Sequence, residues 1–326
     1  MQEEALFQQR TDLQELQEAV SSIHSEIRKV LVGQEELIRL LVTAVLADGH
    51  VLIEGVPGVA KTLSARLLSA TLSVGFSRIQ FTPDLMPSDV LGTTVFNPRD
   101  ARFEFKRGPI FSNLILIDEI NRAPAKTQAA LFEVMEERQV TMDGTTYRLE
   151  LPFMVLATQN PVEQEGTYRL PEAQLDRFLF KIKVPYPGEE EEIHMLSRFN
   201  RVDVADPVSL VQPVLSAARI ASLRQQVRSL HIEEPLLRFI ARLTQATRQH
   251  HSIYLGASPR ASLALMHAAK ATAALQGRDF VTPEDILEVA VPTLRHRLLL
   301  TPEKEMEGVT EEEVIKQILQ TLEIPR

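Results

Sequence analysis

Cysteine is missing from the 326 residues of this chain, and this absence narrows its chemistry. Without cysteine there are no disulfides, thiolate metal ligands or cysteine nucleophiles. The composition fits a cytoplasmic protein, because disulfides are rare in the cytosol. Long apolar runs are also absent. The most apolar stretch, residues 37–56, is interrupted by Arg39, Asp48, His50 and Glu54, so we expect a helix followed by a strand and no membrane span.

Basic residues are in the minority, and the acidic start of the chain lacks the apolar core of a signal peptide. The net charge is −9, so bulk electrostatics oppose non-specific binding to nucleic acid. Hydrophobic residues make up 44% of the chain, which is enough for a folded core, and the length permits two domains.

One glycine-rich segment carries the strongest functional signal. Residues 55–62 read Gly-Val-Pro-Gly-Val-Ala-Lys-Thr, between an apolar run and a helical pattern. Backbone N–H groups of such a loop can surround a polyphosphate, Lys61 can contact its β- and γ-phosphates, and the Thr62 hydroxyl can ligate Mg²⁺. Ala60 replaces the last glycine of the usual pattern, and we expect it to have entered helical backbone angles already.

Two carboxylates follow the next strongly apolar run. Residues 114–117 are all apolar, and Asp118 and Glu119 come directly after them. A buried strand that ends in acids delivers them to the ligand crevice of a parallel sheet. We expect Asp118 to hold Mg²⁺ through water, and Glu119 to polarise the water that attacks the γ-phosphate.

Three further polar residues have both a functional and an ordinary interpretation. Asn160 ends another strand, where its amide could orient the lytic water or sense the γ-phosphate, although asparagine before proline is also common in turns. Arg177 closes a helix, where it either completes the helix dipole or reaches a neighbouring subunit's phosphate. Arg260 lies in the first turn of a helix, where the helix dipole disfavours a cation. A contact with the γ-phosphate would explain an arginine at this position, although its placement could also be chance.

The alternation of apolar runs and helical patterns predicts an α/β domain with a parallel sheet, followed by an all-helical domain. We expect an N-terminal helix over residues 1–30, the α/β domain over 31–187 and a helical lid over 188–326, with the break at Pro185–Gly188. The strands are expected at 51–54, 79–82, 114–117, 154–158 and 180–184. The later helices are expected at 189–200, 217–230, 234–250, 259–275, 283–296 and 311–322, with no strand among them.

Two insertions interrupt the expected α/β domain. Residues 139–150 have the pattern of a hairpin, with Asp143-Gly144 as its two-residue turn. Residues 93–106 form a second excursion that contains three phenylalanines. Phe103 and Phe105 could contact a substrate, or could pack onto one face of a strand.

With these motifs the chain resembles the MoxR family of AAA+ ATPases, from about Leu31 to Arg297. The resemblance rests on short blocks with the following ranges: 32–35, 54–62, 108–111, 118–123, 126–131, 157–161, 165–168 and 170–178. It implies a nucleotide-binding AAA+ core with a helix-2 insertion and a hairpin before sensor 1, followed by a lid.

The resemblance also assigns roles to individual residues. It implies ATP and Mg²⁺ as cofactors, with Lys61, Glu119, Asn160, Arg177 and Arg260 as the catalytic set, and Thr62 and Asp118 as metal ligands. The nucleotide contacts it implies are Gly33, near the adenine, then Gly55, Val56, Pro57, Gly58, Val59, Ala60, Lys61, Thr62 and Leu63, and Arg260 as sensor 2. Arg169 stands where the family has proline, and it is a rival to Arg177 as the arginine that acts across subunits.

The function that the resemblance implies is an ATP-hydrolysing motor in a homo-oligomeric ring of six subunits. Such proteins resemble chaperones that activate partners, often ones with von Willebrand factor A domains, and some relatives assist insertion of metal cofactors. The alternative is a nucleic-acid motor, since the same clade includes ring helicases, but the net charge argues against it. A regulatory scaffold that binds ATP with little turnover is a third possibility, against which Glu119 and Asn160 speak.

Overall fold

The computed structural model describes residues 12–56, 58–160, 168, 170–200 and 206–325. It divides into two compact units. The first contains residues 23–41 and 48–221, and the second contains residues 1–22, 42–47 and 222–326. The expected boundary near residue 187 stays a prediction.

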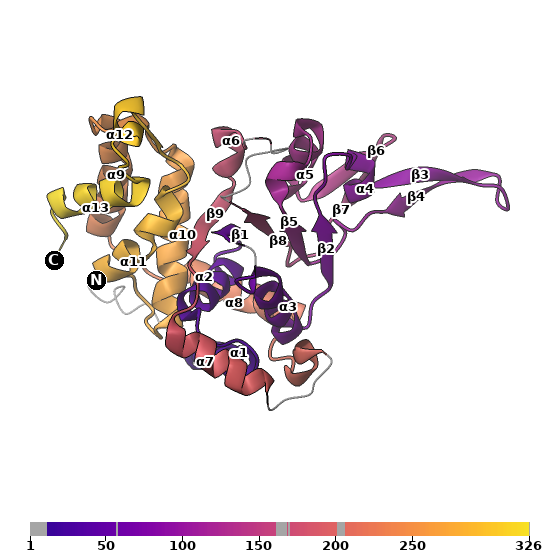
Figure 1. Cartoon of the computed structure of the whole chain (residues 1–326), viewed down its shortest axis with the longest axis horizontal. Coiled ribbons are helices and arrows are strands. Elements are labelled where there is room, and N and C mark those ends of the chain that lie inside the picture. Colours follow the sequence, from indigo (N-terminus) through magenta and orange to yellow (C-terminus); the bar gives the residue numbers. More distant parts are fainter. Residues whose placement is uncertain (1–11, 57, 161–167, 169, 201–205, 326) are drawn as a thin grey trace, which may run out of the picture. The chain divides into compact units, whose positions relative to one another are not determined.

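A five-stranded parallel sheet forms the centre of the first unit, in the order β2-β5-β8-β1-β9 (Figure 1). The strands are β1 (His50–Gly55), β2 (Phe76–Gln80), β5 (Leu114–Asp118), β8 (Met154–Gln159) and β9 (Phe178–Val184). All five expected strands are present, although β2 begins three residues earlier and ends two residues earlier than the expected 79–82. The three central strands are almost completely buried, as strands covered on both faces must be.

Helices and short 3₁₀ turns precede, connect or follow these strands in the chain, and three of the helices named next have residues in both units. In chain order they are α1 (Gln14–Arg28), α2 (Glu35–Leu46), α3 (Lys61–Leu72), α4 (Pro87–Leu91), η2 (Ile120–Arg122), α5 (Ala125–Glu137), α6 (Glu172–Leu175), α7 (Glu189–Phe199), η3 (Pro207–Leu210) and α8 (Ala217–Ser229). One side of α1 is buried through Leu16, Ile23 and Ile27. Residues 1–11 lie outside the described part of the chain.

Both predicted insertions are antiparallel hairpins. β6 (Gln139–Met142) pairs with β7 (Thr145–Arg148), and β3 (Gly92–Asn97) pairs with β4 (Arg102–Arg107). Asp143 and Gly144 both have positive φ, 50° and 75°, as a type I′ hairpin turn requires. Figure 1 shows the β3–β4 hairpin extending away from the sheet, with β6 and β7 near its base.

The second unit is mainly helical. Its helices are α9 (Glu234–Gln249), α10 (Pro259–Leu275), α11 (Pro283–Leu294), α12 (Pro302–Met306) and α13 (Glu311–Thr321). It also contains a small antiparallel sheet of β10 (Ile253–Leu255) and β11 (Leu299–Leu300), where the sequence had indicated no strand. Strands of three and two residues are too short to show an alternating pattern. Among the described residues, no helix is long and apolar enough to cross a membrane.

Candidate functional site

The carboxyl ends of three neighbouring strands carry most of the predicted site residues. The glycine loop follows β1, Asp118 and Glu119 lie at the end of β5, and Asn160 follows β8, which lies between β1 and β5. Asp118 and Asn160 are both buried. The sheet order thus brings together residues that are separated by about a hundred positions in the sequence.

Lys61 begins α3 and its Nζ donates a hydrogen bond to the carbonyl oxygen of Gly55, across the loop. Burial lowers the pKa of Lys61, while Asp118, Glu119 and Glu54 act in the opposite direction. The ammonium group therefore lies within electrostatic reach of all three carboxylates. Thr62 is half-buried in the first turn of the same helix.

Ala60 has a left-handed backbone, with φ 56° and ψ 21°, at the N-cap of α3. The expectation that Ala60 had entered helical angles was therefore wrong. Gly58 also has a positive φ, 89°, and the two residues turn the chain into the helix. A side chain makes left-handed angles unfavourable, which explains why the usual pattern has glycine at position 60. Pro57 lies outside the described residues.

This backbone leads to a stability prediction. Ala60→Gly should raise the free energy of unfolding by about 0.5–1 kcal/mol, because relief of left-handed strain exceeds the extra entropy of glycine in the unfolded chain. Ala60→Val is the matched control and should lower it, since a β-branched residue tolerates positive φ poorly. Urea unfolding of the three proteins measures both changes. A less stable glycine variant would contradict the left-handed assignment.

Hydrogen bonds from neighbouring strands hold both acidic side chains of the site. Arg78 Nε donates to Asp118 Oδ2 at 2.6 Å, and Thr158 Oγ1 donates to Asp118 Oδ1 at 3.3 Å. The Glu119 backbone N–H donates to Thr158 Oγ1 at 3.0 Å. Thr158 thus joins the end of β5 to the end of β8.

Glu119 also has two side-chain partners on one oxygen. Its Oε2 accepts from Gln80 Nε2 at 2.8 Å and forms an ion pair with Arg122 Nε at 3.1 Å. Its backbone is left-handed, with φ 58°, which is unfavourable for a residue with a side chain. Such strain at a residue with converging partners is typical of functional sites.

Sequence reasoning missed Arg78 and Gln80, both on β2. Gln80 lies opposite Asp118 in the register of β2 and β5, and Arg78 lies opposite Leu116. No motif singles these residues out. Arg78 and Gln80 are recognised as part of the site only because β2 pairs with β5 in the sheet. The alternation of strands and helices in the sequence does not predict this order.

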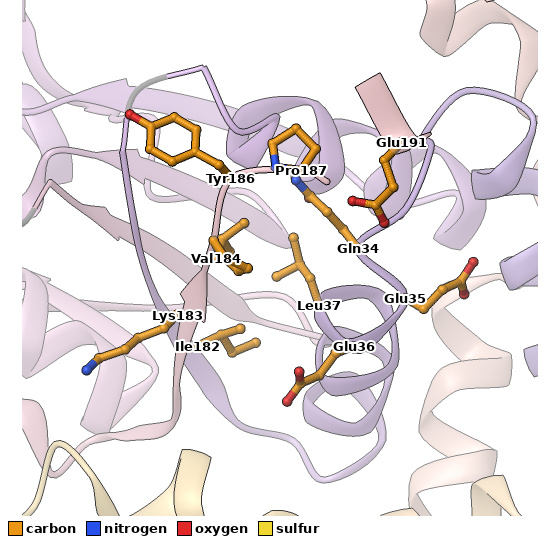
Figure 2. A pocket seen from close by; sticks show the side chains of 11 residues that line it. Gln34, Glu35, Glu36, Leu37, Ile182, Lys183, Val184, Tyr186, Pro187 and Glu191 are labelled. Carbon is orange, nitrogen blue, oxygen red and sulfur yellow. The ribbon is translucent and has the colours of Figure 1, made fainter. Parts of the chain in front are cut away.

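A cavity of about 190 Å³ lies beside the glycine loop. It is lined by the start of α2 and the segment from β9 to α7, including Gln34, Leu37, Ile182, Val184, Tyr186 and Glu191 (Figure 2). Gln34 Nε2 donates to the carbonyl oxygen of Val59 at 3.0 Å, so the cavity wall is tied directly to the loop. Gln34 Oε1 is buried without a hydrogen-bond partner.

Gly33 precedes this wall and has a left-handed backbone, with φ 69°. The left-handed φ favours glycine at this position, and a Cβ at Gly33 would also lie 2.2 Å from Glu191 Oε1, so the Glu191 carboxylate would have to move. The predicted nucleotide contact at Gly33 therefore adjoins a cavity that is connected to the loop. Its role in binding stays a prediction.

The predicted arginines lie in different surroundings. Arg177 follows α6 and forms an ion pair with Glu136 Oε2, with its NH2 at 2.5 Å and its Nε at 2.9 Å, over the ring of Phe132. Arg260 belongs to the second unit, in the first turn of α10, where its backbone N–H donates to the Ser258 N-cap. Arg169 lies outside the described residues.

The parallel sheet, the glycine loop and the paired acids define a nucleotide-binding protein of the P-loop class. Comparison with known proteins is in agreement. Residues 50–180 match the model of the ATPase family associated with various cellular activities (AAA), and residues 245–318 match the AAA lid domain. The chain belongs to the MoxR family of AAA+ ATPases.

The family assignment rests on relatives that extend over most of the chain. "Uncharacterized protein YeaC" of Bacillus subtilis is 47% identical over 92% of this chain and 92% of its own length. "Chaperone MoxR1" of Mycobacterium tuberculosis is 43% identical over 92% of this chain and 81% of its own. A crystal structure from Cytophaga hutchinsonii, provisionally described as an ATPase, has a TM-score of 0.88 and 44% identity, covering 95% of this chain and 96% of that one.

Proposed function

We propose that this chain hydrolyses ATP and uses the energy to remodel or activate partner proteins. The observation that carries the proposal is the convergence of Lys61, the two acids of β5 and Asn160 at one edge of the sheet. Family membership and the name of the chaperone relative support both halves of it. Steady-state release of phosphate from ATP, with and without Mg²⁺, tests the first half.

In the proposed reaction Lys61 exchanges the Gly55 carbonyl for the β- and γ-phosphate oxygens. Glu119 accepts a proton from water while the water oxygen bonds to the γ-phosphorus, and the bond from that phosphorus to the bridging oxygen breaks to release ADP. Gln80 and Arg122 fix the side chain of Glu119 for this step. Asn160 orients the water, and Arg260 and Arg177 contact the γ-phosphate from the lid and from a neighbouring subunit.

The residues present fit a magnesium ion. Thr62 and Asp118 offer hard oxygen ligands, and the described residues contain no cluster of three or more His, Cys, Asp or Glu that could hold a metal alone. Magnesium takes few protein ligands and completes its shell with phosphates and water. When bound, it would neutralise charge on the phosphates.

The cavity beside the loop suits the base of ATP. Its size excludes a whole nucleotide, because ligand pockets for such molecules are typically ~300 Å³ or more. Gln34 Oε1 is a buried hydrogen-bond acceptor without a partner, and it could accept from the exocyclic amine of adenine once the side chain turns toward the cavity. Guanine presents an oxygen at the same position, so this acceptor favours ATP over GTP.

The partners we propose are other copies of this chain, in a ring that is hexameric, and a protein with a von Willebrand factor A domain. Insertion of a metal cofactor into such a partner is one use of the motor. The support is the resemblance to MoxR proteins and the family match. A neighbouring gene that encodes an Asp-x-Ser-x-Ser motif would identify the partner class.

DNA binding distinguishes the proposed function from the alternative of a nucleic-acid motor. We expect duplex DNA to bind with a Kd of ~10⁻⁴ M or weaker at physiological salt, which is ordinary non-specific affinity. The reasons are the net charge of −9 and the β6–β7 hairpin, whose only basic residue is Arg148. Fluorescence anisotropy across a salt series measures this. Micromolar binding with a steep salt dependence would favour the helicase interpretation instead.

A further inference from the structure

The β3–β4 hairpin carries an apolar stripe on one face. Thr94 and Phe96 of β3 lie opposite Phe105 and Phe103 of β4, so the four side chains share a face. The stripe runs from the base of the hairpin toward its tip, which is formed by residues 98–101.

The half of the stripe near the base is covered by the chain itself. The ring of Phe105 stacks on Tyr147 of the β6–β7 hairpin at 4.5 Å, and its edge meets Phe111 at 5.8 Å. Thr94 Oγ1 donates to Asp143 Oδ2 at 2.5 Å, which joins the two hairpins a second time. The β3–β4 hairpin is thus anchored by its neighbour.

The half near the tip is uncovered. Phe96 is 51% exposed and Phe103 is 72% exposed, and their rings contact each other edge to face at 5.3 Å. Phe103 and Phe105 are two residues apart on one face, and Phe105 is partly buried while Phe103 is exposed, because the rings of Tyr147 and Phe111 contact only Phe105. Exposed large apolar side chains in a cluster mark interaction sites more often than exposed single ones do.

The charge around this stripe is opposite to that of the chain. The hairpin has four basic residues, Arg99, Arg102, Lys106 and Arg107, and two acidic residues, Asp100 and Glu104, in a protein of net charge −9. Both acids pair with Arg102. Arg99 at the tip and Lys106 on the opposite face are exposed.

We propose that the uncovered half of this face, Phe96 and Phe103, binds an extended segment of a partner protein with apolar side chains between acidic residues. Tyr147 of strand β7 stacks on Phe105 at the base of the stripe, and alternate side chains of an extended partner segment could contact Phe96 and Phe103 in the same way toward the tip. The exposed Arg99 at the tip, next to Phe96 and Phe103, favours acidic flanks. This proposal rests on the proposed function in one respect, which is that the partner is a protein.

The test uses the full chain and a fluorescein-labelled peptide in which leucine alternates with aspartate and glutamate. The double variant Phe96→Ser and Phe103→Ser should weaken peptide binding by ~10- to 100-fold, as expected for aromatic anchors at an interface. Tyr254→Ser, which removes a 77% exposed aromatic from β10, is the matched control and should leave the affinity unchanged. A peptide with lysine in place of the acids should bind at least tenfold more weakly to the unaltered chain.

Several outcomes would overturn the proposal. These are no binding of the acidic peptide by the unaltered chain, equal binding by the double variant, and an effect of the Tyr254 control as large as that of the double variant. Phe-dependent binding of a DNA oligonucleotide or a phosphatidylserine vesicle in place of the peptide would assign the face to another partner. A changed oligomeric state of the double variant at unchanged peptide affinity would assign it to a second copy of the chain.

ATP hydrolysis by the same preparations separates this proposal from the proposed function. Both phenylalanines are exposed, so their replacement should leave folding and the basal rate intact. Normal hydrolysis without peptide binding refutes the docking face alone. Absent hydrolysis with Phe-dependent peptide binding refutes the motor and retains the docking face.

Discussion

Glu119→Gln is expected to lower the rate of ATP turnover by ~10²–10⁴-fold, the usual contribution of a general base. Glutamine keeps the shape of the side chain and can still bond to Gln80 and Arg122, but its amide cannot accept the proton from water. The backbone of Glu119 is left-handed, and glutamine suits such angles no worse than glutamate. Steady-state phosphate release measures the loss.

ATP affinity distinguishes this variant from a binding mutant. Glu119→Gln should bind a fluorescent ATP analogue about as well as the unaltered chain, because Asp118 and Lys61 are untouched. Lys61→Ala should lose affinity, since the substitution deletes a direct phosphate contact. If Glu119→Gln hydrolyses ATP at close to the normal rate, Glu119 is not the base.

Arg177→Ala should lower turnover by ~10³-fold or more if Arg177 acts as an arginine finger in the neighbouring subunit's site. In one chain Arg177 is paired with Glu136, so its loss could also act through that ion pair. Glu136→Gln is therefore the matched control, because it breaks the same pair and keeps the arginine. The finger assignment expects the Glu136 variant to remain active, and equal loss in both variants would reject it.

Mixing two inactive variants tests whether the arginine acts across subunits. An Arg177→Ala subunit has intact Lys61, Asp118 and Glu119, and a Glu119→Gln subunit has an intact Arg177. With random mixing, about one interface in four is complete, before any cooperativity between sites. We expect a bell-shaped curve of rate against mixing ratio. A flat line, once subunit exchange is verified, would exclude Arg177 in trans and make Arg169 the next residue to replace.

The strands and the edge at which the acids lie could be predicted from the sequence because local patterns specify them. An apolar run predicts a buried strand, and the glycine loop or the two carboxylates that follow it mark the carboxyl end of that strand. The hairpin at residues 139–150 could also be predicted from a local pattern, because Asp143-Gly144 is a typical sequence for a two-residue hairpin turn.

What the sequence did not predict depends on neighbours in space. Gln80 and Arg78 became relevant only through the pairing of β2 with β5. The different solvent exposure of Phe103 and Phe105 depends on the position of the β6–β7 hairpin, whose Tyr147 stacks on Phe105. The backbone angles of Ala60 were predicted wrongly. Alanine favours helical angles, but the loop must turn into α3 at this residue, and the turn requires left-handed angles.

The two joined hairpins also have a mechanical consequence. β4 leads into β5, and β7 leads into β8, and the starts of these two strands are fastened together where Asn113 Nδ2 donates to the Pro152 carbonyl oxygen at 3.0 Å. The far ends of the same strands carry Asp118 and Asn160. We expect a force applied at the tip of the β3–β4 hairpin to act on both hairpins, and through them on the two strands whose carboxyl ends carry Asp118 and Asn160.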